Sequence, residues 1–180
     1  MKRNLSGERN RKENVMTNSR RIASVIVIAL AATAALAQSD AQKSFTQLQS
    51  LSGSWEGKTP DGKPLLVSYR ETAGGSAIMS EIQGTGPENM ISMINMDGPN
   101  RLLMTHYCGA GNQPRLQASA SPDGKTITFT FLDGTNIAPG AGHMQSMVLT
   151  MLDDNHHSED WTFVDHGKEM KEFFDLRRKM

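Results

Sequence analysis

The densest group of residues able to do chemistry lies between residues 101 and 115. His106 and Cys108 are two positions apart, so on an extended strand their side chains point to the same side, and Tyr107 points to the other. An imidazole can accept a proton near neutral pH, and a neighbouring thiol can become a nucleophilic thiolate. The spacing therefore makes His106 and Cys108 candidate catalytic residues, with His106 as the general base.

Ligand binding is a second interpretation of the same segment. Asn112 and Gln113, near the tip of a predicted hairpin, can each donate and accept hydrogen bonds. With His106 and Tyr107 they would form the polar wall of a pocket. A third interpretation needs no ligand, because a buried His106 can bond a neighbouring strand while Asn112 pins the hairpin. Catalysis by the Cys–His pair is the least favoured, since the two side chains would be about 7 Å apart.

The remaining histidines and acidic residues do not predict a metal site. His156 and His157 are adjacent, so on a strand they face opposite sides and cannot share one ion. His143, Glu159 and Asp160 lack the spacing of a known zinc site. We expect Glu159 and Asp160 to be charges at a rim, and we predict no metal and no cofactor.

Residues 1–37 have the pattern of a secretory signal peptide. A basic stretch ends at Arg21, an apolar run follows from Ile22 to Leu36, and Ala35-Leu36-Ala37 provides small residues for cleavage near Ala37. Met16 is an alternative start. The apolar run is shorter than the roughly 20 residues of a membrane span, so the sequence predicts a periplasmic or secreted protein without a stable membrane anchor.

Removing this leader changes the charge of the chain. The remaining residues hold 12 Lys and Arg against 17 Asp and Glu, a net charge near −5. Scattered bases and a negative total argue against nucleic acid as a partner. With a single cysteine there is no internal disulfide, so stability must come from packing. We expect a linker over residues 38–43, one domain over 44–180, and a monomer or weak homodimer.

Short alternating or apolar runs separated by turn signals fill this domain. After a helical turn from Ser44 to Leu51, with Ser44 as its cap, almost no helical periodicity remains. The predicted strands are Ser54–Thr59, Leu65–Thr72, Ser76–Gln83, Met90–Met96, Arg101–Tyr107, Gln113–Ser121, Thr126–Leu132, His143–Leu152, Ser158–Val164 and Lys168–Arg177. The pattern predicts an all-β, closed, antiparallel up-and-down barrel of about eight to ten strands, with an open sandwich as the alternative. The loop Gly134–Gly142 is expected to cover one mouth.

Five short motifs carry a resemblance. They are L-x-G-x-W at Leu51–Trp55, T-H-Y-C at Thr105–Cys108, N-Q-P-R at Asn112–Arg115, Asp160-Trp161 followed by Asp165, Gly167 and Lys168, and F-x-L-x-R at Phe174–Arg178. The combination resembles a family of secreted bacterial lipocalin-like proteins of unknown function within the calycin superfamily. Nitrobindin-type haem barrels are more distantly similar, but no extended match to their haem-site motifs is present.

The resemblance implies structural roles for Gly53, Trp55 and Arg178. Lipocalins pack a basic residue of the last strand across the entrance Trp, and here that residue would be Arg177 or Arg178. Ten methionines beyond the leader suit an adaptable apolar interior. The sequence therefore predicts an exported protein that binds a small, mainly apolar molecule. The alternatives are an isomerase or hydrolase in the same cavity, or a haem-binding barrel.

Overall fold

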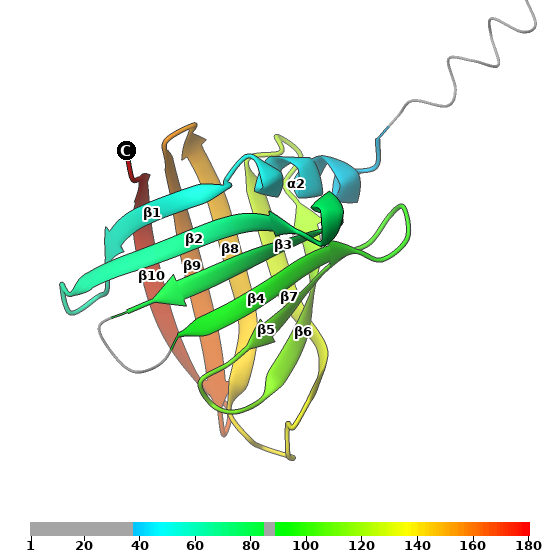
Figure 1. The fold of residues 1–180 in the computed structure, drawn as a ribbon. Helices are drawn as coiled ribbons and strands as arrows, with labels where there is room; N and C mark the ends of the chain where they lie inside the picture. The colour runs from blue at the N-terminus through cyan, green and yellow to red at the C-terminus, as the bar shows by residue number, and fades with distance from the viewer. Residues whose placement is uncertain (1–37, 85–88) are drawn as a thin grey trace, which may run out of the picture. The chain divides into compact units, whose positions relative to one another are not determined.

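Buried and more exposed side chains alternate along most of the strands that the structure describes, as in β3 (Ala77–Gln83). A computed structural model describes residues 38–84 and 89–180, so the predicted signal peptide lies outside the described residues. Figure 1 shows the strands wrapping around a common interior. The elements are α2 (Asp40–Gln49), β1 (Gly53–Lys58), β2 (Pro64–Thr72), η1 (Ala73–Gly75), β3 (Ala77–Gln83), β4 (Met90–Met96), β5 (Leu102–Tyr107), β6 (Gln113–Ala120), β7 (Thr126–Thr135), β8 (His143–Asp153), β9 (His156–Asp165) and β10 (Lys168–Arg178).

Each strand pairs antiparallel with its neighbours in the sequence, and β10 returns to β1. The closed up-and-down barrel is therefore confirmed, and the open sandwich is wrong. Closure is uneven, however. β10 pairs with β9 from Lys168 to Arg177, but with β1 only through Trp55–Arg178 and Glu56–Arg177. The first half of β10 thus has one strand neighbour among the described residues.

The helix begins earlier than the sequence predicts. Ser39, not Ser44, is the N-cap: its hydroxyl accepts from the Gln42 backbone N–H, and the Gln42 side chain accepts from the Ser39 N–H. Ser44 is instead buried with Leu48 on the face turned to the barrel. The expected linker over residues 38–43 therefore contains the first turn of α2. The helix packs at the barrel end where β2, β4, β5 and β6 meet it, which we call the helix end.

Trp55 is buried inside the barrel at the helix end. The indole is 1% exposed, and its Nε1 donates to the Leu51 carbonyl at 2.8 Å. Arg178, not Arg177, lies over the ring, 4.3 Å from its centroid, and donates to the carbonyls of Ser50 and Ser52. Gly53 has φ +132°, a conformation that favours glycine, and a Cβ there would lie 3.1 Å from Arg178 Nη1 and crowd that side chain.

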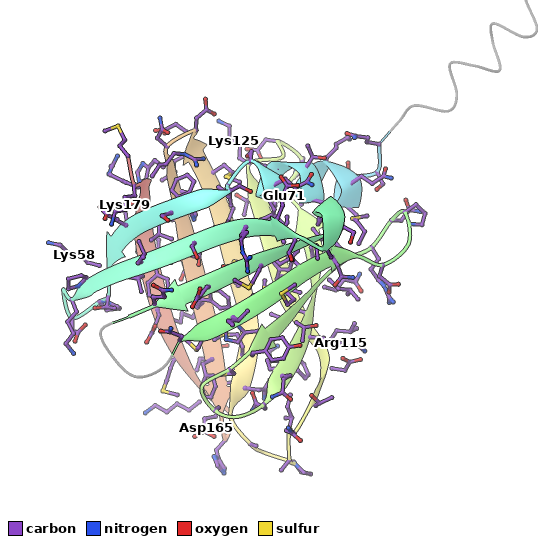
Figure 2. All side chains as sticks on the ribbon, in the orientation of Figure 1. Lys58, Glu71, Arg115, Lys125, Asp165 and Lys179 are labelled. Carbon is purple, nitrogen blue, oxygen red and sulfur yellow. The ribbon has the colours of Figure 1, made fainter. Side chains whose placement is uncertain are left out.

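The opposite end of the barrel is formed by the β3–β4, β5–β6, β7–β8 and β9–β10 connections, and we call it the loop end. Figure 2 shows Asp165 at this end and Lys125, in the β6–β7 turn, near the helix end. The apolar core spans the barrel from Leu48 of α2 to Met144 and Phe174. No helix within residues 38–84 and 89–180 is both long and apolar enough to cross a membrane.

Candidate functional site

An apolar cavity of about 290 Å³ opens at the loop end of the barrel. Such a volume is at the lower limit of small-molecule sites. Its walls come mainly from the inner faces of β3, β5, β8, β9 and β10 and from the β5–β6 connection. The lining residues are Ile82, Met90, His106, Cys108, Gly109, Ala110, Met144, Trp161, Phe163, Met170, Glu172 and Phe174.

His106 is the predicted site residue that the fold places in the cavity wall and buries completely. Its Nδ1 is 2.9 Å from the Ser92 hydroxyl on the neighbouring strand. Its Nε2 is buried and has no hydrogen-bond partner among the described residues. An orphaned buried nitrogen costs free energy unless a ligand or water bonds it. The His106 ring therefore offers one unused polar atom beside an apolar cavity.

Burial also sets the charge state of His106. Desolvation lowers the pKa of the imidazole to about 4, and the negative charge of Glu159 opposes that shift only in part. His106 is accordingly neutral at pH 7. A neutral ring can donate from one nitrogen and accept at the other, which suits an uncharged hydrogen-bonding group of a ligand.

The other predicted contact residues are not brought together with His106. Tyr107 and Gln113 line a shallow depression on the outer surface of the barrel, with Arg115. Gln113 accepts there from the Thr135 hydroxyl at 2.7 Å. Asn112 is buried, and its side-chain amide donates to the Gly142 carbonyl at 2.7 Å. Asn112 thus ties the β5–β6 connection to the loop that precedes β8, as the interpretation without a ligand expects.

Cys108 lines the same cavity as His106, as the two-residue spacing predicts. It stands just after β5 ends at Tyr107 and is partly exposed. The Cys108 backbone N–H bonds the Asn112 carbonyl at 3.0 Å, which closes the turn of this hairpin. Both residues of the candidate Cys–His pair therefore face one cavity, with the thiol nearer to its mouth.

Glu159 is the polar residue whose place sequence reasoning missed. The side chain was expected at a rim, but it is fully buried inside the barrel. Its carboxylate accepts from the Tyr69 hydroxyl at 2.5 Å and from Trp161 Nε1 at 2.9 Å, and His157 Nε2 is 3.2 Å away. Three partners of this kind compensate a buried charge. Burial and the Glu159 charge in turn raise the pKa of Tyr69 well above its ordinary value.

A row of polar side chains crosses the wall of the barrel from this cluster to the cavity. Tyr69 lies opposite Ser80, Ser80 opposite Ser92, and Ser92 opposite His106 on consecutive strands. The His106 ring then lies 5.0 Å from the Trp161 ring, centroid to centroid. Side chains alternate between the two faces of β9, so Glu159 must point inward with Trp161 and Phe163. This alternation is the sequence signal that could have placed Glu159 inside the barrel.

Within the described ranges, no group of three or more His, Cys, Asp or Glu side chains is placed to hold a metal ion. His156 and His157 do diverge: His157 is buried against Trp55, and His156 contacts Asp175 near the surface. The divergence follows from strand geometry, as the sequence predicts.

Comparisons with known proteins give a fold and no more. No protein-family model matches the chain, and no curated protein does either. The crystal structure of Rv2717c from M. tuberculosis has a TM-score of 0.49 and 17% identity, over 76% of this chain and 98% of that one. A DUF3598 protein of unknown function from Nostoc punctiforme has a TM-score of 0.50 and 10% identity, over 74% of this chain and 49% of its own. At that identity the likeness is one of fold, and membership in a lipocalin-like family stays a prediction.

Proposed function

We propose that this chain is an exported protein that binds a small, mainly apolar molecule in the cavity at the loop end. The observation that carries the proposal is the His106 side chain, which is wholly buried, lines the cavity and leaves Nε2 without a partner among the described residues. A polar atom of a ligand would satisfy that nitrogen, while Met, Phe and Trp side chains would contact an apolar body.

Binding is better supported than catalysis with His106 as general base. A base is most effective when its pKa is near the working pH, and burial lowers the pKa of His106 to about 4. The buried carboxylate of Glu159 does not compensate by orienting the ring, because it bonds Tyr69, His157 and Trp161 instead. His106 is therefore suited to fix the orientation of a ligand.

Native mass spectrometry of the protein purified gently from the organism that encodes it tests this proposal without a guess about the ligand. We expect an added mass on the wild-type protein. Met170→Trp would fill the cavity mouth and abolish that mass, because Met170 lines the cavity from β10. Phe173→Trp is the matched control, since Phe173 is half exposed on the outer face of the same strand. An added mass that survives Met170→Trp, or a protein that is always empty, would contradict the proposal.

A further inference from the structure

Among the described residues that line the cavity, one carries a charge, and it is acidic. Glu172 lines the cavity beside its mouth, and it lies directly across from Trp161 in the β9–β10 pairing. Its flanking inward residues on β10 are Met170 and Phe174, which also line the cavity. An inward carboxylate thus interrupts a face that is otherwise apolar.

No ion pair among the described residues neutralises Glu172. Within residues 38–84 and 89–180, Lys171 forms an ion pair with Glu169 on the outer face of β10, and no ion pair includes Glu172. The residues that line the cavity include no Lys or Arg. An anionic ligand would therefore meet a like charge without compensation, whereas a cationic ligand would supply the missing partner.

The aromatic residues of the cavity favour a cation at the same place. Trp161, Phe163 and Phe174 contribute ring surfaces to the wall, and aromatic faces attract ammonium groups. The Trp161 ring is the cross-strand neighbour of Glu172, so a group placed at that carboxylate lies beside an indole. Glu159 adds a further negative charge next to Trp161, because its carboxylate accepts a hydrogen bond from Trp161 Nε1.

We infer that the cavity selects amines: a protonated amino group at Glu172, an apolar or aromatic body along Trp161, and a small hydrogen-bonding group at Nε2 of His106. This inference rests on the proposed binding function and names the class of ligand for that site. The two polar anchors lie on β5 and β10, with Trp161 of β9 between them in the lining.

Three molecules of one shape test the inference on the full chain: tyramine, tyrosol and 4-hydroxyphenylacetate. They share a phenol that can bond His106 and differ in an ammonium, a hydroxyl or a carboxylate at the other end. Isothermal titration calorimetry should give the tightest binding for tyramine and the weakest for 4-hydroxyphenylacetate. Partly exposed ion pairs are modest, so we expect about a fivefold preference for tyramine over tyrosol, reduced by added salt.

Two variants assign that preference to a residue. Glu172→Gln should lower the affinity for tyramine by about fivefold and abolish its preference over tyrosol, whereas Glu169→Gln, the same change on the outer face, should preserve the order of affinities. If Glu172 serves only to keep the edge of β10 from pairing with other strands, Glu172→Gln will not alter the order of affinities, and the inference falls. Equal binding of all three molecules overturns the inference alone. Absence of binding by all three at millimolar concentration also overturns the inference, whereas the proposed function is overturned by a wild-type protein that is always empty in native mass spectrometry.

Discussion

The two ends of the barrel differ in how many of their buried polar groups are paired. At the helix end, Trp55 Nε1 bonds the Leu51 carbonyl, and Arg178 donates to carbonyls of Ser50, Ser52 and Asp154. Among the described residues, one buried polar atom at the helix end, His157 Nδ1, has no partner, whereas His106 Nε2, Asn112 Oδ1 and His143 Nε2 have none at the loop end. Paired groups stabilise a fold, whereas an orphaned group at a cavity leaves a contact for a ligand.

The two tryptophans illustrate this difference between the ends of the barrel. Trp55 is enclosed by Arg178 on its face and by His157, whose ring centroid is 4.3 Å away. Trp161 is almost as buried, at 4% exposure, but its ring also forms part of the cavity wall. Burial alone therefore does not separate an indole packed in the core from one that borders a cavity, and the space beside the ring does.

The largest effect that this contrast predicts is on Trp55. Trp55→Ala removes a buried indole, its hydrogen bond and the surface under Arg178. We expect it to lower the free energy of unfolding by about 3–5 kcal/mol, measured by urea denaturation. Trp55→Phe keeps most of the apolar volume and should cost less. A loss under about 1 kcal/mol for Trp55→Ala would show that the contacts of Trp55 at the helix end contribute little to the stability of the barrel.

The second prediction concerns the pH dependence of stability at the loop end. The pKa of His106 is about 4 in the folded protein against 6.5 for the ordinary side chain. As the pH falls, His106 therefore takes up a proton in the unfolded chain before it does so in the folded protein. The free energy of unfolding consequently falls between pH 6.5 and pH 4, by about 3 kcal/mol in total. His106→Gln should flatten this part of the curve of unfolding free energy against pH. His166→Gln, at an exposed histidine, should leave it unchanged.

Most of the fold could be predicted because local signals in the sequence agree with each other. Strand β4 begins and ends where its apolar run does, at Met90 and Met96. Asp-Gly pairs mark the turns at residues 61–62, 97–98 and 123–124, whereas Asp133-Gly134 lies inside β7. The helix was the exception, since its cap at Ser39 depends on a reciprocal bond with Gln42 rather than on apolar spacing. The extension of β7 to Thr135 also exceeds its apolar run, because pairing with β6 continues past it.

The site was less predictable, because it is assembled across strands far apart in the sequence. His106 was identified by its residue type, but its place beside Trp161 depends on barrel closure. Glu159 was assigned to the surface from its charge, whereas Tyr69, 90 positions earlier, supplies a donor that permits burial. Residue type also gave a wrong expectation for Tyr107 and Gln113. Both are polar, but the alternation of side chains along their strands points them outward, away from the cavity.

A smaller effect is predicted for Arg178 at the helix end. Arg178→Gln removes the group stacked on Trp55 and its bonds to Ser50 and Ser52. The side chain is partly exposed, so we expect a loss of about 1–2 kcal/mol in the free energy of unfolding. Arg177→Gln, on the outer face beside it, should change stability much less. Equal losses for the two variants would mean that charge, not the stacked geometry, is what matters.

The smallest effect on stability is expected at the cavity mouth, where Met170 is 47% exposed. Met170→Ala removes apolar surface that solvent already reaches, so the free energy of unfolding should change by less than about 0.5 kcal/mol. The same substitution enlarges the mouth and removes ligand contacts, so it should weaken binding of the small molecule while thermal unfolding stays the same. A stability loss as large as that of Arg178→Gln would contradict the contrast between the ends, because the loop end would then also hold the barrel together.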